Sequence, residues 1–259
     1  MELREFSEEQ MTEIYNRYMV ADFPQDELKP LGRILDMIKT GLCCAYGLYD
    51  DEKDGGGLRG YATFIVPDGL RYGLLDYLAV LKEYRGTGVG HAFFHLVGDT
   101  LTARYPALRG FFIESEAVAY AADERERQIR EKRISFYIQN KCLDTVLGSK
   151  LFGVIYSILL YDFCSETGDV ASTEGMALTG DVASTEGMTP TEGMASIDDL
   201  DAIYRAMFPE RHYKQNVDLW EDRRKHGSRQ ENPVRSSEDF ASEPFTPAGI
   251  SRTADRQKP

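Results

Sequence analysis

The chain has 259 residues, of which 42% are hydrophobic and 28% are charged. This balance is ordinary for soluble globular proteins and excludes disorder of the whole chain. The formal net charge is −13, from 43 acidic residues against 30 lysines and arginines. Nucleic acid is therefore not expected as a partner, because a phosphate-binding surface needs a basic face. No apolar run approaches the roughly 18–20 residues of a membrane span, so no membrane partner is expected either.

The cysteines and the N-terminal sequence point to a reducing compartment. The cysteines form no CxxC pair and no metal-type spacing. The opening sequence MELREFSEEQ lacks a basic region followed by an apolar stretch, which predicts that there is no signal peptide. We therefore expect reduced thiols and a cytoplasmic location. The cysteines are Cys43, Cys44, Cys142 and Cys164.

Residues 1–164 alternate helical and strand patterns, as expected for one packed domain. Ser7 can cap a helix that runs to about Met19, and a second helix is predicted from Asp26 to Lys39, broken early by Pro30. This order predicts an α/β (α+β) fold with a mixed, mostly antiparallel central sheet and helices on both faces. The remaining elements are strands over 43–50, 61–66 and 74–81, a helix over 89–103, a strand over 110–117, a helix over 122–140 and a hairpin of strands over 145–147 and 153–161.

The sequence changes character after residue 164. The segment TGDVASTEGM starts at Thr167 and again at Thr179, and its last four letters recur at Thr191. Because these repeats are short and rich in Gly, Ser, Thr and acids, we expect a disordered linker over 165–195 and a disordered tail over 221–259. Between them, Ser196 can cap a short helix that docks on the domain within 196–220. Its apolar docking face consists of Leu200, Ile203, Tyr204 and Met207.

A glycine-rich loop joins the strand at 74–81 to the next helix. Consecutive small residues let several backbone N–H groups turn toward one point at a helix N-terminus, where the dipole favours an anion. A phosphate or pyrophosphate is the natural ligand, and an ordinary structural turn is the alternative. The loop is neither a Walker motif, since no lysine follows its last glycine, nor a GxGxxG motif, since His91 replaces the third glycine. Its residues are Arg85, Gly86, Thr87, Gly88, Val89 and Gly90.

Two sequence blocks resemble the GNAT superfamily of N-acetyltransferases, and the resemblance spans nearly all of Met1 to about Asp162. The loop matches the family pattern Arg/Gln-x-x-Gly-x-Gly/Ala through Arg85, Gly88 and Gly90. The segment RISFYIQNKC resembles the pattern Arg-x-x-Phe-Tyr-x-x-Asn-Gly-Phe. It departs from that pattern after Asn140, which tolerates the left-handed conformation of this helix exit. The matching residues are Arg133, Phe136, Tyr137 and Asn140, and Lys141 and Cys142 replace the family's Gly and Phe.

The resemblance implies acetyl-CoA as the co-substrate. Its pyrophosphate would lie on the loop backbone near His91, and its pantetheine arm would align like an added strand with the backbone at positions 78–80. Asn140 is implied either to bind the cofactor or simply to cap its helix. No metal is expected, because His91 and His95 have no third ligand near them. The strand residues beside the arm are Leu78, Ala79 and Val80.

Three residues are candidates for the chemistry. The resemblance implies that Tyr137 protonates the leaving thiolate of CoA, and a core tyrosine is the alternative. Glu114 and Asp76 are candidate bases for the amine, in that order, because a carboxylate inside an apolar strand indicates a functional cleft. A water chain is the alternative to both, and Glu116 is interpreted as a solvated sheet end.

We therefore expect an N-acyltransferase that moves an acetyl group from acetyl-CoA directly to an amine acceptor, either a small molecule or a peptide. A thioester relay through Cys142 is a variant of this mechanism. The alternative function is a catalytically silent CoA-binding or regulatory module with the acidic repeat tail as its interaction segment. The acceptor and the oligomeric state stay open.

Overall fold

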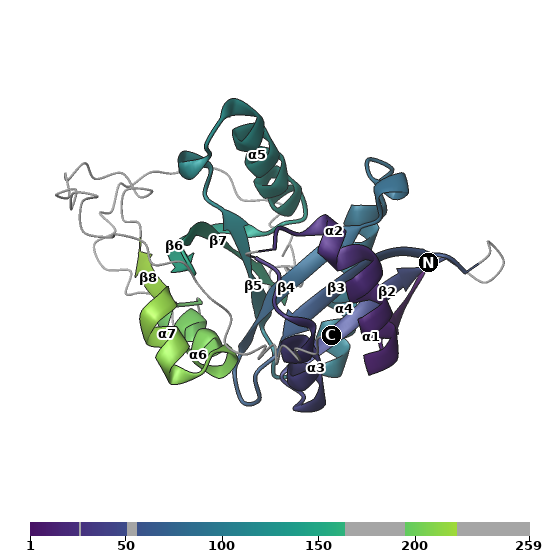
Figure 1. Cartoon of the computed structure of the whole chain (residues 1–259), viewed down its shortest axis with the longest axis horizontal. Helices are drawn as coiled ribbons and strands as arrows, with labels where there is room; N and C mark the ends of the chain where they lie inside the picture. The colour runs from purple at the N-terminus through teal and green to yellow at the C-terminus, as the bar shows by residue number, and fades with distance from the viewer. Residues whose placement is uncertain (26, 51–55, 164–194, 222–259) are drawn as a thin grey trace, which may run out of the picture.

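A computed structural model of the chain describes residues 1–25, 27–50, 56–163 and 195–221 (Figure 1). The predicted linker over 165–195 and the predicted tail over 221–259 lie outside these residues, except for Ala195 and Glu221. The domain boundaries inferred from the sequence therefore stay predictions.

The described residues form an eight-stranded sheet with the order β1-β2-β3-β4-β5-β7-β6-β8. β4 and β5 pair in parallel, and the other neighbouring strands pair antiparallel. The predicted mixed, mostly antiparallel sheet is thus confirmed. The strands are β1 (Glu2–Glu5), β2 (Cys43–Tyr49), β3 (Leu58–Ile65), β4 (Tyr72–Val80), β5 (Gly110–Glu116), β6 (Leu143–Leu151), β7 (Val154–Asp162) and β8 (Val217–Glu221).

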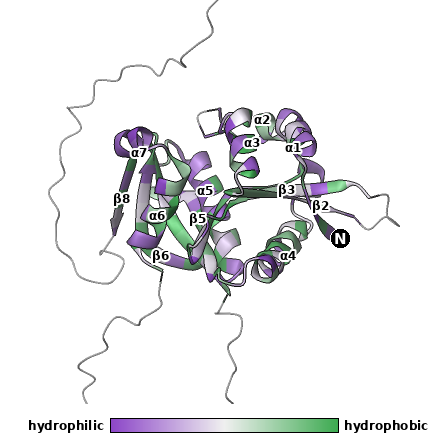
Figure 2. Ribbon diagram, turned by 90° about the horizontal axis from the view of Figure 1, so that it is seen from below, coloured by the Kyte–Doolittle hydropathy of each residue, from purple (hydrophilic) through white to green (hydrophobic). Residues whose placement is uncertain are grey.

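Helices cover both faces of the sheet, so that two apolar cores form. Figure 2 shows α1, α2 and α3 on one side of the strands and α4 on the other. α6 adds to the core on the first side, and α5 adds to the core on the α4 side. The helices are α1 (Glu8–Ile14), η1 (Tyr15–Met19), α2 (Val20–Asp22), α3 (Leu31–Lys39), η3 (Lys82–Tyr84), α4 (Val89–Arg104), η4 (Val118–Tyr120), α5 (Glu124–Gln139), α6 (Ile197–Met207) and α7 (Glu210–Asn216).

Side-chain caps fix several helix starts. Ser7 and Ser196 each form a capping box with the residue three positions later, and Asp123 accepts a hydrogen bond from the backbone of Glu126. These caps satisfy backbone N–H groups that lack a partner within the helix. The helix predicted from Asp26 begins at Leu31, directly after the proline expected to break it, because Pro30 occupies its N-cap with an extended backbone.

The sequence patterns missed β1, α7 and β8 and made β6 too short. β1 consists of ELRE, which has little apolar signal, and pairing with β2 positions it. β8 packs its Trp220 against β6 at Gly148, where an added Cβ would lie 2.5 Å from the indole. Contacts with distant residues therefore define these elements, and a local pattern does not reveal them.

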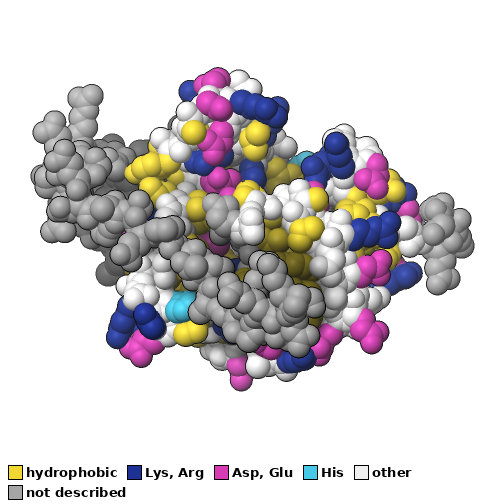
Figure 3. Space-filling model, viewed as in Figure 1, with side chains coloured by type: hydrophobic (Ala, Val, Ile, Leu, Met, Phe, Trp, Pro, Cys, Tyr) yellow, Lys and Arg dark blue, Asp and Glu magenta, His cyan; other side chains and the backbone are white. Residues whose placement is uncertain are grey.

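α5 projects from the rest of the molecule with a charged surface. Acidic and basic side chains alternate over it in Figure 3. Arg127 pairs with Glu131 at 2.9 Å and Arg130 with Glu126 at 2.6 Å, both at the spacing of one helical turn. This surface explains why so polar a sequence forms a helix.

Candidate functional site

The glycine loop presents a row of unpaired backbone amides where α4 begins. Gly86 and Gly88 have φ angles of 78° and 86°, in the left-handed region that glycine adopts most readily. The N–H groups of residues 86–90 donate to no other described residue. A Cβ at Gly86 or Gly88 would meet no atom within 4 Å, so the space beside the loop is open. Free amides and the helix dipole together make this loop suited to an anion.

The loop is fastened to the elements on either side of it. Arg85 Nε donates to the carbonyl of Val80 at 2.8 Å, and its Nη2 donates to Asp22 Oδ1 at 2.8 Å. Thr87 Oγ1 donates to the carbonyl of Tyr84 at 2.6 Å. These bonds hold the loop against β4 and α2 without using its amides.

The two sequence blocks meet in space. A Cβ at Gly90 would lie 3.3 Å from Phe136 Cε2, so a small residue is needed where α4 passes α5. Asn140 Nδ2 donates to the carbonyl of Phe136 at 2.7 Å, and Asn140 Oδ1 lies 3.0 Å from His91 Nδ1. Because that oxygen can only accept, His91 Nδ1 carries the hydrogen. The amide of Asn140 is thus engaged within the protein, which favours the capping role over cofactor binding.

The left-handed residue at the C-terminal end of α5 is Lys141, whereas the sequence suggested Asn140. Asn140 has φ −92°, and Lys141 takes the left-handed conformation with φ 65°. The N–H of Cys142 donates to the carbonyl of Tyr137 at 3.0 Å, and the N–H of Lys141 donates to that of Ile138 at 3.0 Å. This pair of bonds is a Schellman motif, which places its left-handed residue one position after the helix cap. A lysine therefore occupies the conformation that glycine favours.

Tyr137 lies at the edge of the core between α4 and α5. Its side chain packs against Phe94 and Phe136, with ring centroids 5.8 and 5.2 Å away, and the residue is 7% exposed. Burial raises the pKa of Tyr137 to about 12, so its hydroxyl is protonated at neutral pH. No described residue forms a hydrogen bond with that hydroxyl. The hydroxyl is thus available as a proton donor.

β4 and β5 separate from each other partway along their length. Their pairing runs from Tyr72 opposite Gly110 to Leu75 opposite Ile113 and stops there, although both strands continue. The register with β3 shifts at the same point, since Thr63 faces Tyr77 and Phe64 faces Leu75. Asp76 is the extra residue of this bulge. Beyond it, the backbone at 78–80 pairs with β3 on one side and with no described strand on the other.

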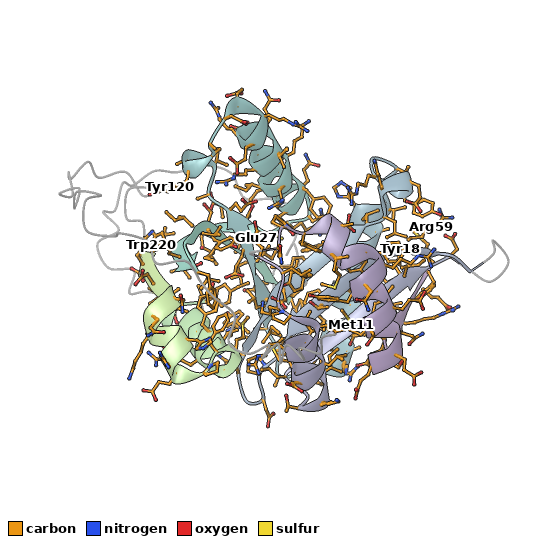
Figure 4. The ribbon with its side chains drawn as sticks, viewed as in Figure 1. Met11, Tyr18, Glu27, Arg59, Tyr120 and Trp220 are labelled. Carbon is orange, nitrogen blue, oxygen red and sulfur yellow. The ribbon has the colours of Figure 1, made fainter. Side chains whose placement is uncertain are left out.

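Asp76 is occupied by a buried cation. Lys29 Nζ lies 2.5 Å from Asp76 Oδ1, and the Asp76 side chain is 3% exposed. Burial acts to lower the pKa of Lys29, but the charge of Asp76 outweighs it with help from Tyr77, so the pKa is raised. The Tyr77 hydroxyl also accepts from the backbone N–H of Lys29 at 2.9 Å and donates to the carbonyl of Glu27 at 2.9 Å. These bonds hold the segment before α3 over β4, and Figure 4 shows Glu27 near the middle of the molecule.

Glu114 has a different environment. It lies on β5, and its carboxylate accepts a hydrogen bond from the hydroxyl of Tyr204 on α6. Burial raises the pKa of Glu114 to about 7, while the bond from Tyr204 and the charge of Lys29 oppose this rise. A carboxylate with such a pKa exchanges protons near neutral pH.

Glu116 is ion-paired and half-buried, which differs from the expected solvated sheet end. Arg130 and Arg133 of α5 lie 2.9 and 2.7 Å from its two oxygens. It therefore joins β5 to α5.

Sequence reasoning missed two residues of this region, Lys29 and Tyr204. Tyr204 belongs to the apolar face predicted for α6, whose four residues are all buried. The pattern indicates a docking surface but gives no sign that one hydroxyl reaches Glu114. Lys29 lies in a turn, and no local signal marks it.

The chain is an α/β protein with a loop of free backbone amides, suited to an anion, beside two parallel strands that separate. Residues 3–104 match the model of the Acetyltransferase (GNAT) family. The resemblance noted in the sequence is thereby confirmed, and the protein is an acyltransferase. The match ends at the last residue of α4, so the block from Arg133 to Asn140 lies beyond it.

Solved structures of acetyltransferases are similar to this chain. A GNAT-family protein from Bacteroides thetaiotaomicron is 15% identical, with 62% of this chain and 87% of that chain covered and a TM-score of 0.47. Spermidine N-acetyltransferase from Vibrio cholerae, in complex with CoA and spermine, is 11% identical, with 62% and 94% covered and a TM-score of 0.45. The ribosomal-protein-S18-alanine N-acetyltransferase of Escherichia coli is 13% identical, with 62% and 92% covered and a TM-score of 0.42. No curated protein sequence matches the chain.

Two features are absent from the part of the chain that the structure describes. Its helices include none with the length and apolar character of a membrane span. Its His, Cys, Asp and Glu side chains form no group of three or more arranged as metal ligands.

Proposed function

We propose that the protein transfers an acetyl group from acetyl-CoA directly to the nitrogen of an amine, carried by a small molecule or a peptide. The observation that carries this proposal is the row of free amides at 86–90 beside the unpaired edge of β4 at 78–80. The amides suit a pyrophosphate, and the strand edge suits the amide groups of a pantetheine arm.

In this proposal two side chains handle the protons. Glu114 takes a proton from the amine, and the nitrogen then forms a bond to the acetyl carbonyl carbon. The carbon–sulfur bond breaks, and the thiolate of CoA takes the proton of the Tyr137 hydroxyl. The pKa of Glu114, about 7, supports its choice as the base, since a base works best near the operating pH. Asp76 is the weaker candidate because its charge is paired with Lys29.

Direct transfer is favoured over a relay through Cys142. That thiol is buried, and burial raises its pKa to about 12. The thiolate is the nucleophilic form of cysteine, so a thiol with this pKa is a poor acyl acceptor at neutral pH. The rate would then come chiefly from positioning the two reactants. We also propose a cytoplasmic location, which the free thiols of Cys43, Cys44 and Cys142 support.

The substitution Gly88→Val tests the loop, with Gly41→Val as the matched control. Both glycines have left-handed φ angles, 86° and 75°, and open space around the missing Cβ. Each substitution should therefore reduce stability by a similar amount, roughly 1–2 kcal/mol. We expect only Gly88→Val to weaken acetyl-CoA binding, by about tenfold or more, because its side chain blocks the approach of the pyrophosphate.

Titration calorimetry on folded protein measures the dissociation constants, and thermal melting compares the stabilities. An unchanged acetyl-CoA dissociation constant in folded Gly88→Val would overturn the loop assignment. CoA release with a panel of primary amines then tests turnover. Tight binding of acetyl-CoA without release on any amine would support the silent module in place of an enzyme.

A further inference from the structure

α6 brings a hydroxyl group to Glu114 from a distant part of the chain. Tyr204 is 0% exposed and donates to Glu114 Oε1 across 90 positions of sequence. The hydroxyl of Ser149 on β6 lies 3.2 Å from that of Tyr204. Because the tyrosine has a single hydroxyl hydrogen and the carboxylate can only accept, this hydrogen goes to Glu114 and Ser149 donates to Tyr204. Two consecutive hydrogen bonds, from Ser149 to Tyr204 and from Tyr204 to Glu114, thus end on Oε1 of Glu114.

The hydroxyl is not needed for the docking of α6. The neighbours of Tyr204 on the buried face are apolar, namely Leu200, Ile203 and Met207. A phenyl ring would fill the same space and would avoid burying a polar group. The presence of a hydroxyl here is therefore explained by its partners, Glu114 and Ser149.

Several charged or titratable groups surround Glu114. Lys29 and Glu27 come from the segment before α3, Asp76 from β4 and Tyr156 from β7. Burial is the largest influence and raises the pKa of Glu114. Tyr204 opposes it most, followed by Lys29, whereas Asp76 and Glu27 add to the rise. Among the described residues, Tyr204 is the group that hydrogen-bonds Oε1, and none hydrogen-bonds Oε2.

We propose that Tyr204 is a positioning residue of the acyl-transfer site, which holds Glu114 by Oε1 and leaves Oε2 to take the proton of the amine. α6, which follows the repeat segment in the sequence, thereby completes the site. This inference rests on the proposed function of Glu114 as the base.

The substitution Tyr204→Phe removes the hydrogen bond and keeps the ring, and Tyr213→Phe is the matched control. Tyr213 lies on α7 in the same part of the chain and donates to Asp201, away from Glu114. A hydrogen bond to a carboxylate favours its charged form, so its loss should raise the pKa of Glu114. We expect the acid limb of the kcat/KM profile to move to higher pH in Tyr204→Phe. The rate at pH 6 should fall about tenfold or more and approach the wild-type rate at high pH.

Tyr213→Phe should leave the acid limb in place. An unmoved limb in folded Tyr204→Phe, or an equal movement in both variants, would overturn the inference. If Tyr204→Phe does not fold, Ser149→Ala replaces it. That variant removes the donor to Tyr204 and should move the limb in the same direction by a smaller amount, and no movement would overturn the inference.

A second readout does not depend on turnover. Carbon-13 NMR follows the titration of the Glu114 carboxyl group. Its signal is assigned as the one that is missing from the spectrum of Glu114→Gln. We expect a midpoint near pH 7 in the wild type and a higher one in Tyr204→Phe. An unchanged midpoint with normal turnover overturns the role of Tyr204 and leaves the proposed function standing. A moved midpoint in a protein that acetylates no amine supports the coupling of Tyr204 to Glu114 and counts against the proposed function.

Discussion

Removing the hydroxyl of Tyr137 separates proton transfer from packing. In Tyr137→Phe the ring keeps its contacts with Phe94 and Phe136. No described residue hydrogen-bonds the hydroxyl, so no protein hydrogen bond is broken. The loss of stability should therefore stay within about 0.5 kcal/mol, below the roughly 1 kcal/mol of a lost buried hydrogen bond.

The effect on turnover should be much larger. With a pKa of about 12, the Tyr137 hydroxyl holds its proton at neutral pH and can give it to a departing thiolate. A positioned acid contributes roughly 10²–10⁴-fold, which corresponds to a barrier increase of about 3–5 kcal/mol. The acetyl-CoA dissociation constant should stay nearly constant, because the intact thioester does not take up this proton.

The assay measures kcat with any amine that the enzyme accepts, normalised to folded protein. The acetyl-CoA dissociation constant and the melting temperature are measured on the same variants and compared with the wild type. Tyr105→Phe serves as the control, since its pKa is also raised to about 12 but it lies just past the far end of α4 from the glycine loop. A wild-type kcat in Tyr137→Phe, or an equal loss in Tyr105→Phe, would refute the role of the hydroxyl.

Two further predictions concern stability and are measured by urea denaturation. Lys141→Gly should stabilise the protein by roughly 0.5–1 kcal/mol, because glycine adopts φ 65° without strain, and a loss of stability would contradict the assigned helix exit. Lys29→Met should destabilise it by roughly 3–5 kcal/mol, because Asp76 is left charged and buried. The double variant Lys29→Met/Asp76→Leu should recover most of that loss, and no recovery would show that the pair does not account for it.

The sequence predicted features that depend on local chemistry. Gly86 and Gly88 have the left-handed angles that a loop of this type needs, and the serines at positions 7 and 196 cap their helices as expected. The helical spacing of Leu200, Ile203 and their neighbours correctly gave a buried face. Each of these signals lies within a few residues of the element that it defines.

Features that depend on distant contacts were not predictable in this way. The pairs Lys29–Asp76 and Tyr204–Glu114 are separated by 47 and 90 positions. The β-bulge that sets Asp76 apart depends on the register with β3. The helix exit at Lys141 was misjudged by one residue, because the backbone bonds of the Schellman motif decide which residue is left-handed.

Asp76 and Glu114 are carboxylates on neighbouring strands that have different partners. Asp76 forms an ion pair with the buried ammonium group of Lys29. Glu114 is matched by a neutral hydroxyl, which can remain a neighbour whether Glu114 is charged or not. Glu114 can therefore gain and lose a proton while it keeps its partner, and burial already favours its neutral form. A base must accept a proton in every cycle, so the neutral partner of Glu114 supports the proposed role of this carboxylate as the base, whereas the ion pair of Asp76 counts against that role for Asp76.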